Sequence, residues 1–190
     1  MQAQPGTQTV ETARLILRRF TQADGASVLK NWAADARVQS PYAEPVYETP
    51  EAVRGLLGRY IAAYEERNAY RWAIVLRERQ ECIGQIAFFL VDEKNRFAEL
   101  EYCIGSAFQG RGLATEATRA VMGFGFAHMN LHKVQISHKA GNTASRRVIE
   151  KCGFVYEGTL RDYFYEDGRY TDRLFYSVLR SEYEAGVAQL

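Results

Sequence analysis

One crossover connection constrains the fold more than any other feature of the sequence. Three strand-like segments, 70–77, 82–91 and 97–104, are separated by short polar turns, which favours an antiparallel meander. A helical stretch at about 112–129 then separates the third segment from a short strand at 134–138. Such a crossover makes the two strands parallel when they are neighbours. The sequence therefore predicts a mixed, mostly antiparallel sheet.

The remaining elements follow from apolar periodicity, capping residues and turn signals. Thr21 and Asp24 resemble a capping box, Thr49 precedes Pro50 at a helix start, and Gly153 ends a helix. In chain order we expect a strand at 14–18, a helix at 21–32, a loop at 40–49, a helix at 49–67, a helix at 142–152, and strands at 154–165 and 170–179 joined by a hairpin turn. This gives an α/β (α+β) domain with about seven strands and about four helices.

Length and composition indicate one globular domain. The chain has 190 residues, of which 47% are hydrophobic and 25% charged. We expect a polar leader at 1–10, one domain at 11–182 and a tail at 183–190. The net charge of +1 gives no support to a nucleic-acid partner.

Features of targeting and redox chemistry favour the cytoplasm. The first ten residues hold no apolar targeting segment, and no run of about 18 apolar residues occurs, so we expect no membrane association. Cys82, Cys103 and Cys152 have apolar neighbours, which is typical of buried thiols in a reducing compartment.

The segment from Gln109 to Glu116 carries the clearest functional signal. A strand ends at Ile104, a loop containing Gly105, Gly110 and Gly112 follows, and a helix begins. Glycine lets a backbone approach a ligand, and the first helical turn has unpaired amides with a partial positive charge. Together they predict an anion site suited to a pyrophosphate, to which Arg111 can add a positive charge. The alternative is a tight loop without a ligand.

Two motifs at a fixed order resemble the GNAT superfamily of N-acetyltransferases. Gln109-x-x-Gly112-x-Ala114 is similar to its acyl-CoA motif, and Asn142 through Ser145 to Gly153-Phe154 is similar to its second signature. The segments 12–18 and 157–162, with Asp172, resemble the branch that acetylates the N-terminal amines of ribosomal proteins. The similarity extends over about residues 11–180.

The resemblance implies a cofactor site and a reaction. The fourth and fifth strands of such a sheet splay apart and hold acetyl-CoA between them, with no metal. It implies that the end of the fourth strand contacts the thioester and pantetheine, that the loop and first helical turn bind the pyrophosphate, and that Asn142 and Ser145 contact the pantetheine arm. The residues so assigned are Tyr102, Cys103, Ile104, Gln109, Gly110, Arg111, Gly112, Leu113, Ala114, Thr115, Asn142 and Ser145.

Direct acetyl transfer needs a donor that protonates the departing thiolate. Many superfamily members use a Tyr four residues after Ser145, but Ile149 occupies that position here. The Ser145 hydroxyl is the candidate that the ribosomal-protein branch suggests, although it can equally bond within its own helical turn. A main-chain amide near Cys103 or Ile104 is the implied oxyanion donor.

Two glutamates are candidates for the base. Glu99 and Glu101 share one strand face about 7 Å apart, so repulsion and burial can suit one of them to take a proton through water. We expect Glu99 to be the better candidate, and the alternative for each is an ion pair with Arg or Lys. His138 fits a structural role better than a catalytic one, and a covalent route through Cys103 remains an alternative.

The acceptor is expected to be a primary amine, held by aromatic and acidic side chains. Candidates near the helical N-terminal part and the final hairpin are Trp32, Tyr42, Glu44, Tyr47, Glu101, Tyr163, Tyr165 and Glu166. The leading hypothesis is a protein N-terminal α-amine. The alternatives are a small amine, such as a polyamine, amino sugar or antibiotic, and a non-catalytic acyl-CoA sensor. A nucleotide diphosphate on the same anion site is disfavoured by the second signature, and the chain is expected to be a monomer or a homodimer.

Overall fold

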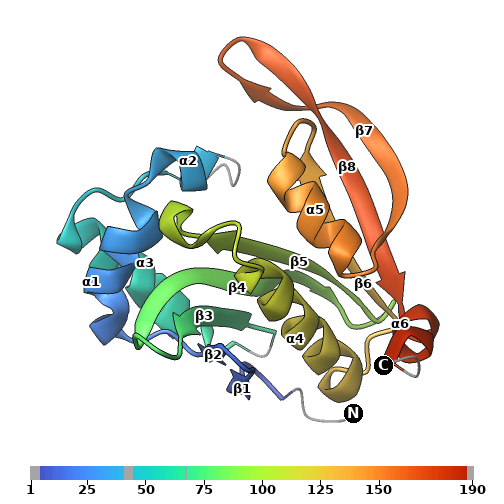
Figure 1. Cartoon of the computed structure of the whole chain (residues 1–190), viewed down its shortest axis with the longest axis horizontal. Helices are drawn as coiled ribbons and strands as arrows, with labels where there is room; N and C mark the ends of the chain where they lie inside the picture. The colour runs from blue at the N-terminus through green and yellow to red at the C-terminus, as the bar shows by residue number, and fades with distance from the viewer. Residues whose placement is uncertain (1–4, 41–44, 67, 188–190) are drawn as a thin grey trace.

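The computed structural model describes residues 5–40, 45–66 and 68–187, which form one sheet flanked by helices (Figure 1). The strands are β1 (Val10–Glu11), β2 (Leu15–Arg18), β3 (Tyr70–Leu76), β4 (Glu81–Asp92), β5 (Phe97–Ile104), β6 (Lys133–Lys139), β7 (Val155–Glu166) and β8 (Arg169–Leu179). The helices are α1 (Gly25–Val28), α2 (Ala36–Gln39), α3 (Pro50–Ala63), α4 (Leu113–His128), α5 (Thr143–Lys151) and α6 (Arg180–Val187). None of the helices in these ranges is long and apolar enough to cross a membrane.

The eight strands form one sheet in the order β1-β2-β3-β4-β5-β6-β8-β7. Every neighbouring pair is antiparallel except β5 and β6, which the α4 crossover makes parallel. The predicted mixed, mostly antiparallel sheet is therefore confirmed, as is the single α/β domain.

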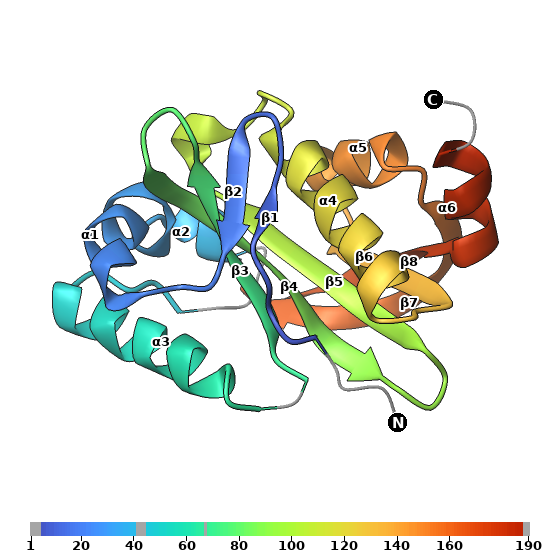
Figure 2. The same ribbon diagram turned by 90° about the horizontal axis from the view of Figure 1, so that it is seen from below.

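Helices cover both faces of the sheet and produce two buried clusters (Figure 2). Strand alternation sends Leu100 and Ile104 of β5 into the cluster that includes residues of α4, and Cys103 into the cluster that includes residues of α1 and α3. Packing on both faces of β5 thus fixes the orientation of the strand, and this orientation determines which of its side chains reach the site.

The helical start of the chain differs from the prediction. The expected helix at 21–32 is divided into a short 3₁₀ helix (Gln22–Asp24), α1 and a π-helical turn (Leu29–Ala33), with α2 following. Asp24 does accept from the backbone amide of Thr21 (2.8 Å), but it also pairs with Arg18 of β2. This tertiary contact anchors the first turn to the sheet instead of leaving a regular helix.

The ends of the fold extend past the expected elements. β1 pairs with β2, and Thr7 donates to the carbonyl of Ala69 (2.9 Å). At the other end, α6 begins at Arg180, whose guanidinium donates to the carbonyls of Leu131 and Phe126. The helix that Thr49 caps ends at Ala63 rather than near residue 67. Glu66, three residues later, lies in a bend and the chain then enters β3.

Candidate active site

The site lies where β5 and β6 separate. Their parallel pairing covers 97–100 of β5 and ends at Leu100 with Ile136. Beyond this point 101–104 remains paired with β4, while β6 continues to Lys139 paired with β8. A cleft of about 430 Å³ occupies the V between them, so the predicted splay is confirmed. In Figure 1, α2 lies on one side of the separated ends of β5 and β6, and α5 with the β7–β8 hairpin lies on the other.

One end of the cleft is formed by the glycine loop and the first turn of α4. Gly110 has φ 75° and Gly112 has φ 77°, a left-handed conformation that glycine adopts without a Cβ penalty. Gly112 is the N-cap of α4, and within the described part of the chain this helix start has no side-chain cap bond. Its first-turn amides are donors available to an anion at a positive helix end. Gln109 closes the loop by donating from Nε2 to the carbonyl of Ile104 (2.9 Å).

A hydrogen-bonded anchor fixes this loop against the N-terminal strands. Glu116 accepts from the Thr12 hydroxyl (2.6 Å) and from the Arg14 Nε (2.6 Å), and Arg14 also donates to the carbonyl of Arg111 (2.9 Å). Burial by itself raises the pKa of Glu116, but the bonds from Thr12 and Arg14 outweigh it and hold that pKa below its usual value. The anchor therefore keeps the amides of the loop in place.

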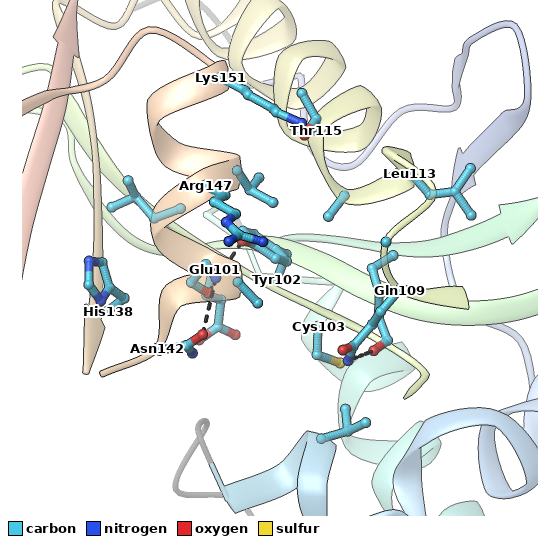
Figure 3. A pocket seen from close by; sticks show the side chains of 18 of the residues that line it. Glu101, Tyr102, Cys103, Gln109, Leu113, Thr115, His138, Asn142, Arg147 and Lys151 are labelled. Carbon is cyan, nitrogen blue, oxygen red and sulfur yellow. Dashed lines mark hydrogen bonds between the residues drawn. The ribbon is translucent and has the colours of Figure 1, made fainter. Parts of the chain in front are cut away.

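The opposite wall is the start of α5. Asn142 caps this helix, since its Oδ1 accepts from the amide of Ser145 (3.1 Å). The Tyr102 hydroxyl of β5 donates to Ser145 Oγ (3.3 Å) (Figure 3). Arg147 and Lys151 extend along the same helix at the cleft. Neither was a predicted site residue, although their spacing of four residues places them on one helix face.

The predicted cofactor residues gather at this cleft with one exception. Those that line it are Tyr102, Cys103, Ile104, Gln109, Gly110, Gly112, Leu113, Ala114, Thr115, Asn142 and Ser145. Arg111 is absent from the described lining, and its guanidinium lies over the ring of Phe108 at 5.9 Å. Other basic side chains line the cleft, Arg147 and Lys151 among them, and sequence reasoning missed these two.

The two predicted carboxylates have different surroundings. Glu99 is 5% exposed, pairs with Arg173 of β8 and accepts from the Ser137 hydroxyl (3.0 Å). Glu101 lines the cleft and accepts from Arg71 Nη2 (3.1 Å). Geometry therefore favours Glu101 over Glu99 as the carboxylate that a bound amine can reach, the reverse of the sequence-based preference.

Cys103 and His138 both lie at the cleft in settings unlike those of reactive groups. Burial raises the pKa of the Cys103 thiol far above its usual value, so it carries no thiolate at neutral pH. His138 stacks on Tyr176 with ring centroids 5.5 Å apart, and its Nδ1 donates to the carbonyl of Lys139 (2.7 Å). This geometry argues against the covalent route through Cys103 and is consistent with a structural His138.

Comparison with known proteins identifies the family of this chain. A family model described as an acetyltransferase (GNAT) domain matches residues 14–155. The chain belongs to the GNAT acetyltransferase family. YoaA of Bacillus subtilis, an uncharacterized N-acetyltransferase, is 33% identical over 171 residues, covering 90% of this chain and 96% of YoaA.

Two further relatives of this acetyltransferase have different acceptors in their names. YdaF of Bacillus subtilis, a candidate ribosomal N-acetyltransferase, is 39% identical over 101 residues, covering 53% of this chain and 55% of YdaF. A crystal structure of spermidine N-acetyltransferase from Vibrio cholerae with CoA and spermine superposes with a TM-score of 0.78 at 25% identity, covering 91% of this chain and 99% of that one. Both are N-acetyltransferases, and acetyl-CoA is the cosubstrate of the GNAT acetyltransferase family to which this chain belongs.

The lining of the cleft suits acetyl-CoA in its chemistry. A pyrophosphate needs several hydrogen-bond donors and positive charge, and the uncapped start of α4 with Arg147 and Lys151 supplies both. Val38, Cys103 and Phe108 give the lining an apolar part that suits a small acyl group.

The predicted acceptor residues of this GNAT enzyme are only partly brought to the cleft. Trp32 is 1% exposed and lies in the cluster with α1 and α3, and the Tyr47 hydroxyl accepts from Arg59 (3.0 Å) in the same cluster. Neither lines the cleft. The prediction was wrong for both because local aromatic composition does not distinguish a core residue from a binding residue. Tyr163 is 48% exposed on the hairpin, and its hydroxyl accepts from Arg173 Nη1 (2.9 Å).

The other acceptor candidates have different surroundings. Glu101 lines the cleft, Tyr165 is exposed on the hairpin, and Glu166 pairs with Lys139. Tyr42 and Glu44 lie outside the described residues.

Proposed function

We propose that this acetyltransferase modifies the N-terminal α-amine of a protein in the cytoplasm by direct transfer from acetyl-CoA. The observation that supports it is the state of the carboxylates around the acceptor end of the cleft. Four of them are each in an ion pair, namely Asp35 with Arg37, Glu99 with Arg173, Glu101 with Arg71 and Glu166 with Lys139. Glu101 is the one acidic side chain among the described residues that line the cleft.

This charge balance suits an acceptor with one positive charge better than a polycation. A polyamine carries several charges that must be matched when they leave water, and paired carboxylates offer little net attraction. A peptide N-terminus brings one amine with a pKa near about 8, and so is partly neutral at physiological pH without a strong base. The candidate ribosomal N-acetyltransferase among the relatives agrees with this acceptor.

The proposed reaction assigns one task to each group at the V. The neutral amine attacks the thioester carbonyl, and a main-chain amide at Cys103 or Ile104 stabilises the oxyanion. The carbon–sulfur bond then breaks, the electron pair stays on sulfur, and the Ser145 hydroxyl supplies the proton. Glu101, through water, is the proposed acceptor of the amine proton, because Glu99 lies deeper and is held by Arg173 and Ser137.

A turnover screen with acetyl-CoA tests this acceptor directly. The acceptors are peptides with free N-termini, the same peptides with blocked N-termini and an internal lysine, spermidine, and amino sugars. We expect turnover of the free peptides only, with kcat/KM rising with pH through a midpoint at about 8 and levelling off above it as the α-amine loses its proton. Preference for spermidine would establish the polyamine alternative, and acetyl-CoA binding without turnover of any amine would establish a sensor.

A further inference from the structure

The Tyr102 side chain connects two walls of the cleft that no backbone pairing joins. It extends from β5 to α5, where its hydroxyl donates to Ser145 Oγ (3.3 Å) (Figure 3). The two residues are 43 positions apart in the chain. Its ring packs against the main core, so the hydroxyl is held by the position of the ring.

This bond determines how the Ser145 hydroxyl can be used. A hydroxyl has one proton to donate and lone pairs that accept. Since Ser145 Oγ accepts from Tyr102, its own proton is directed to a different partner. The amide of Ser145 is fixed by Asn142, which also limits rotation of the first turn of α5. Burial raises the pKa of Tyr102 to about 12, so the phenol stays protonated and remains the donor at neutral pH.

The helix position that many family members fill with a proton-donating Tyr has no such function here. Ile149 is fully buried in the core and has no polar atom in its side chain. Among the described lining of the cleft, Tyr102 is the one tyrosine, and it comes from the strand rather than the helix.

We propose that Tyr102 is a positioning residue, whose hydroxyl orients Ser145 so that the Ser145 proton points to the sulfur of acetyl-CoA. This rests on the proposed function, in which Ser145 serves the departing thiolate. When the amine nitrogen bonds to the carbonyl carbon, the carbon–sulfur bond breaks with its electron pair on sulfur. Sulfur takes the Ser145 proton, and Glu101, which takes the amine proton through water, returns a proton to Ser145 by the same route. Tyr102 keeps its own proton throughout.

The pKa of the CoA thiol in the binary complex tests this without any knowledge of the acceptor. It is followed by the ultraviolet absorbance of the thiolate in the wild type, in Tyr102→Phe, in Ser145→Ala and in the double variant. A directed hydroxyl stabilises the thiolate, so each single variant should raise the thiol pKa by about one unit, a tenfold change in ionisation. The double variant should match the singles, because the two groups act through one bond.

Tyr176→Phe is the matched control. It also removes one phenol hydroxyl, which lies 3.4 Å from His138 Nε2, and Tyr176 is absent from the cleft lining. We expect this variant to leave the thiol pKa unchanged. On the best amine from the turnover screen, Tyr102→Phe should lower kcat about tenfold with little change in the KM for acetyl-CoA.

The outcomes separate the positioning role from the proposed function. If Tyr102→Phe has the wild-type thiol pKa, the positioning role is overturned, whatever its melting temperature. The same conclusion follows if Tyr102→Phe shifts the pKa but Ser145→Ala does not. A wild-type protein that binds no CoA would overturn the proposed function, and the positioning role with it.

Discussion

Replacing Gly112 with aspartate would place a negative charge at the start of α4, where the structure presents uncapped amides. The matched variant is Gly112→Asn, which has nearly the same shape without the charge. Gly112 has φ 77°, and Asn and Asp tolerate this left-handed conformation better than other residues with a side chain. Both variants therefore share a backbone cost of about 1 kcal/mol, and their difference isolates the charge.

The size of that difference follows from Coulomb's law. At a separation of about 5 Å and an effective dielectric constant of about 20, one carboxylate and one phosphate charge repel by about 3 kcal/mol. This is a loss of more than about a hundredfold in affinity. The protein itself should not lose stability from the charge, because a carboxylate at a helix N-terminus is favourable by about 0.3–1 kcal/mol.

Calorimetric titration with acetyl-CoA measures both affinities, and thermal unfolding without ligand measures both stabilities. We expect Gly112→Asp to bind at least about a hundredfold more weakly than Gly112→Asn, and the gap to narrow as salt is added. Its melting temperature should equal or exceed that of Gly112→Asn. Equal affinities for the two variants would refute the assignment of the α4 start as the pyrophosphate site.

Three further outcomes follow from packing and charge. Gly84→Ala should lower the free energy of unfolding by more than about 3 kcal/mol in denaturant, because the added Cβ would lie 2.1 Å from the Cys103 carbonyl oxygen. The control is Gly55→Ala on α3, which has open space around the added Cβ and should be neutral or stabilising. Glu99→Gln should lower the free energy of unfolding by about 3 kcal/mol, because it leaves the charge of Arg173 without its carboxylate partner. A variant with wild-type stability and a lowered kcat would instead indicate that Glu99 is catalytic. The raised pKa of Cys103 means that its contribution to stability is complete below the ordinary thiol pKa of about 8.5 and is lost as pH rises above it. Alkylation of the folded protein at neutral pH, detected by mass spectrometry, would contradict its burial.

Local patterns were sufficient to predict the sheet and the glycine loop before α4. The crossover through α4 required parallel neighbours, and the glycines before Leu113 marked the loop, because both depend on residues close together in the chain. The same local reasoning failed for α6, whose sequence is mostly polar. That helix is held by distant contacts, such as the stacking of Tyr183 on Phe126 at 4.8 Å.

Side-chain partners across the sheet were beyond local reasoning. Glu99 and Arg173 are 74 positions apart, and Glu101 and Arg71 are 30 apart. Nothing in either neighbourhood identifies the partner, so the preference for Glu99 over Glu101 was made without the ion pairs that distinguish them in the structure. The side-chain bond of Tyr102 to Ser145 was missed for the same reason, since the two residues are 43 positions apart.

The separation of β5 from β6 also has a consequence for the protein without its ligand. From residue 101 to 104, β5 has a neighbour in β4 but none on the side of β6, so the sheet contains an edge in its interior. Edges of this kind are templates for any extended chain, and proteins protect them by cover or closure. On the cofactor assignment proposed above, the cover here is acetyl-CoA rather than a segment of polypeptide. Wrong strand pairing at this edge should then become less frequent as acetyl-CoA occupies the cleft.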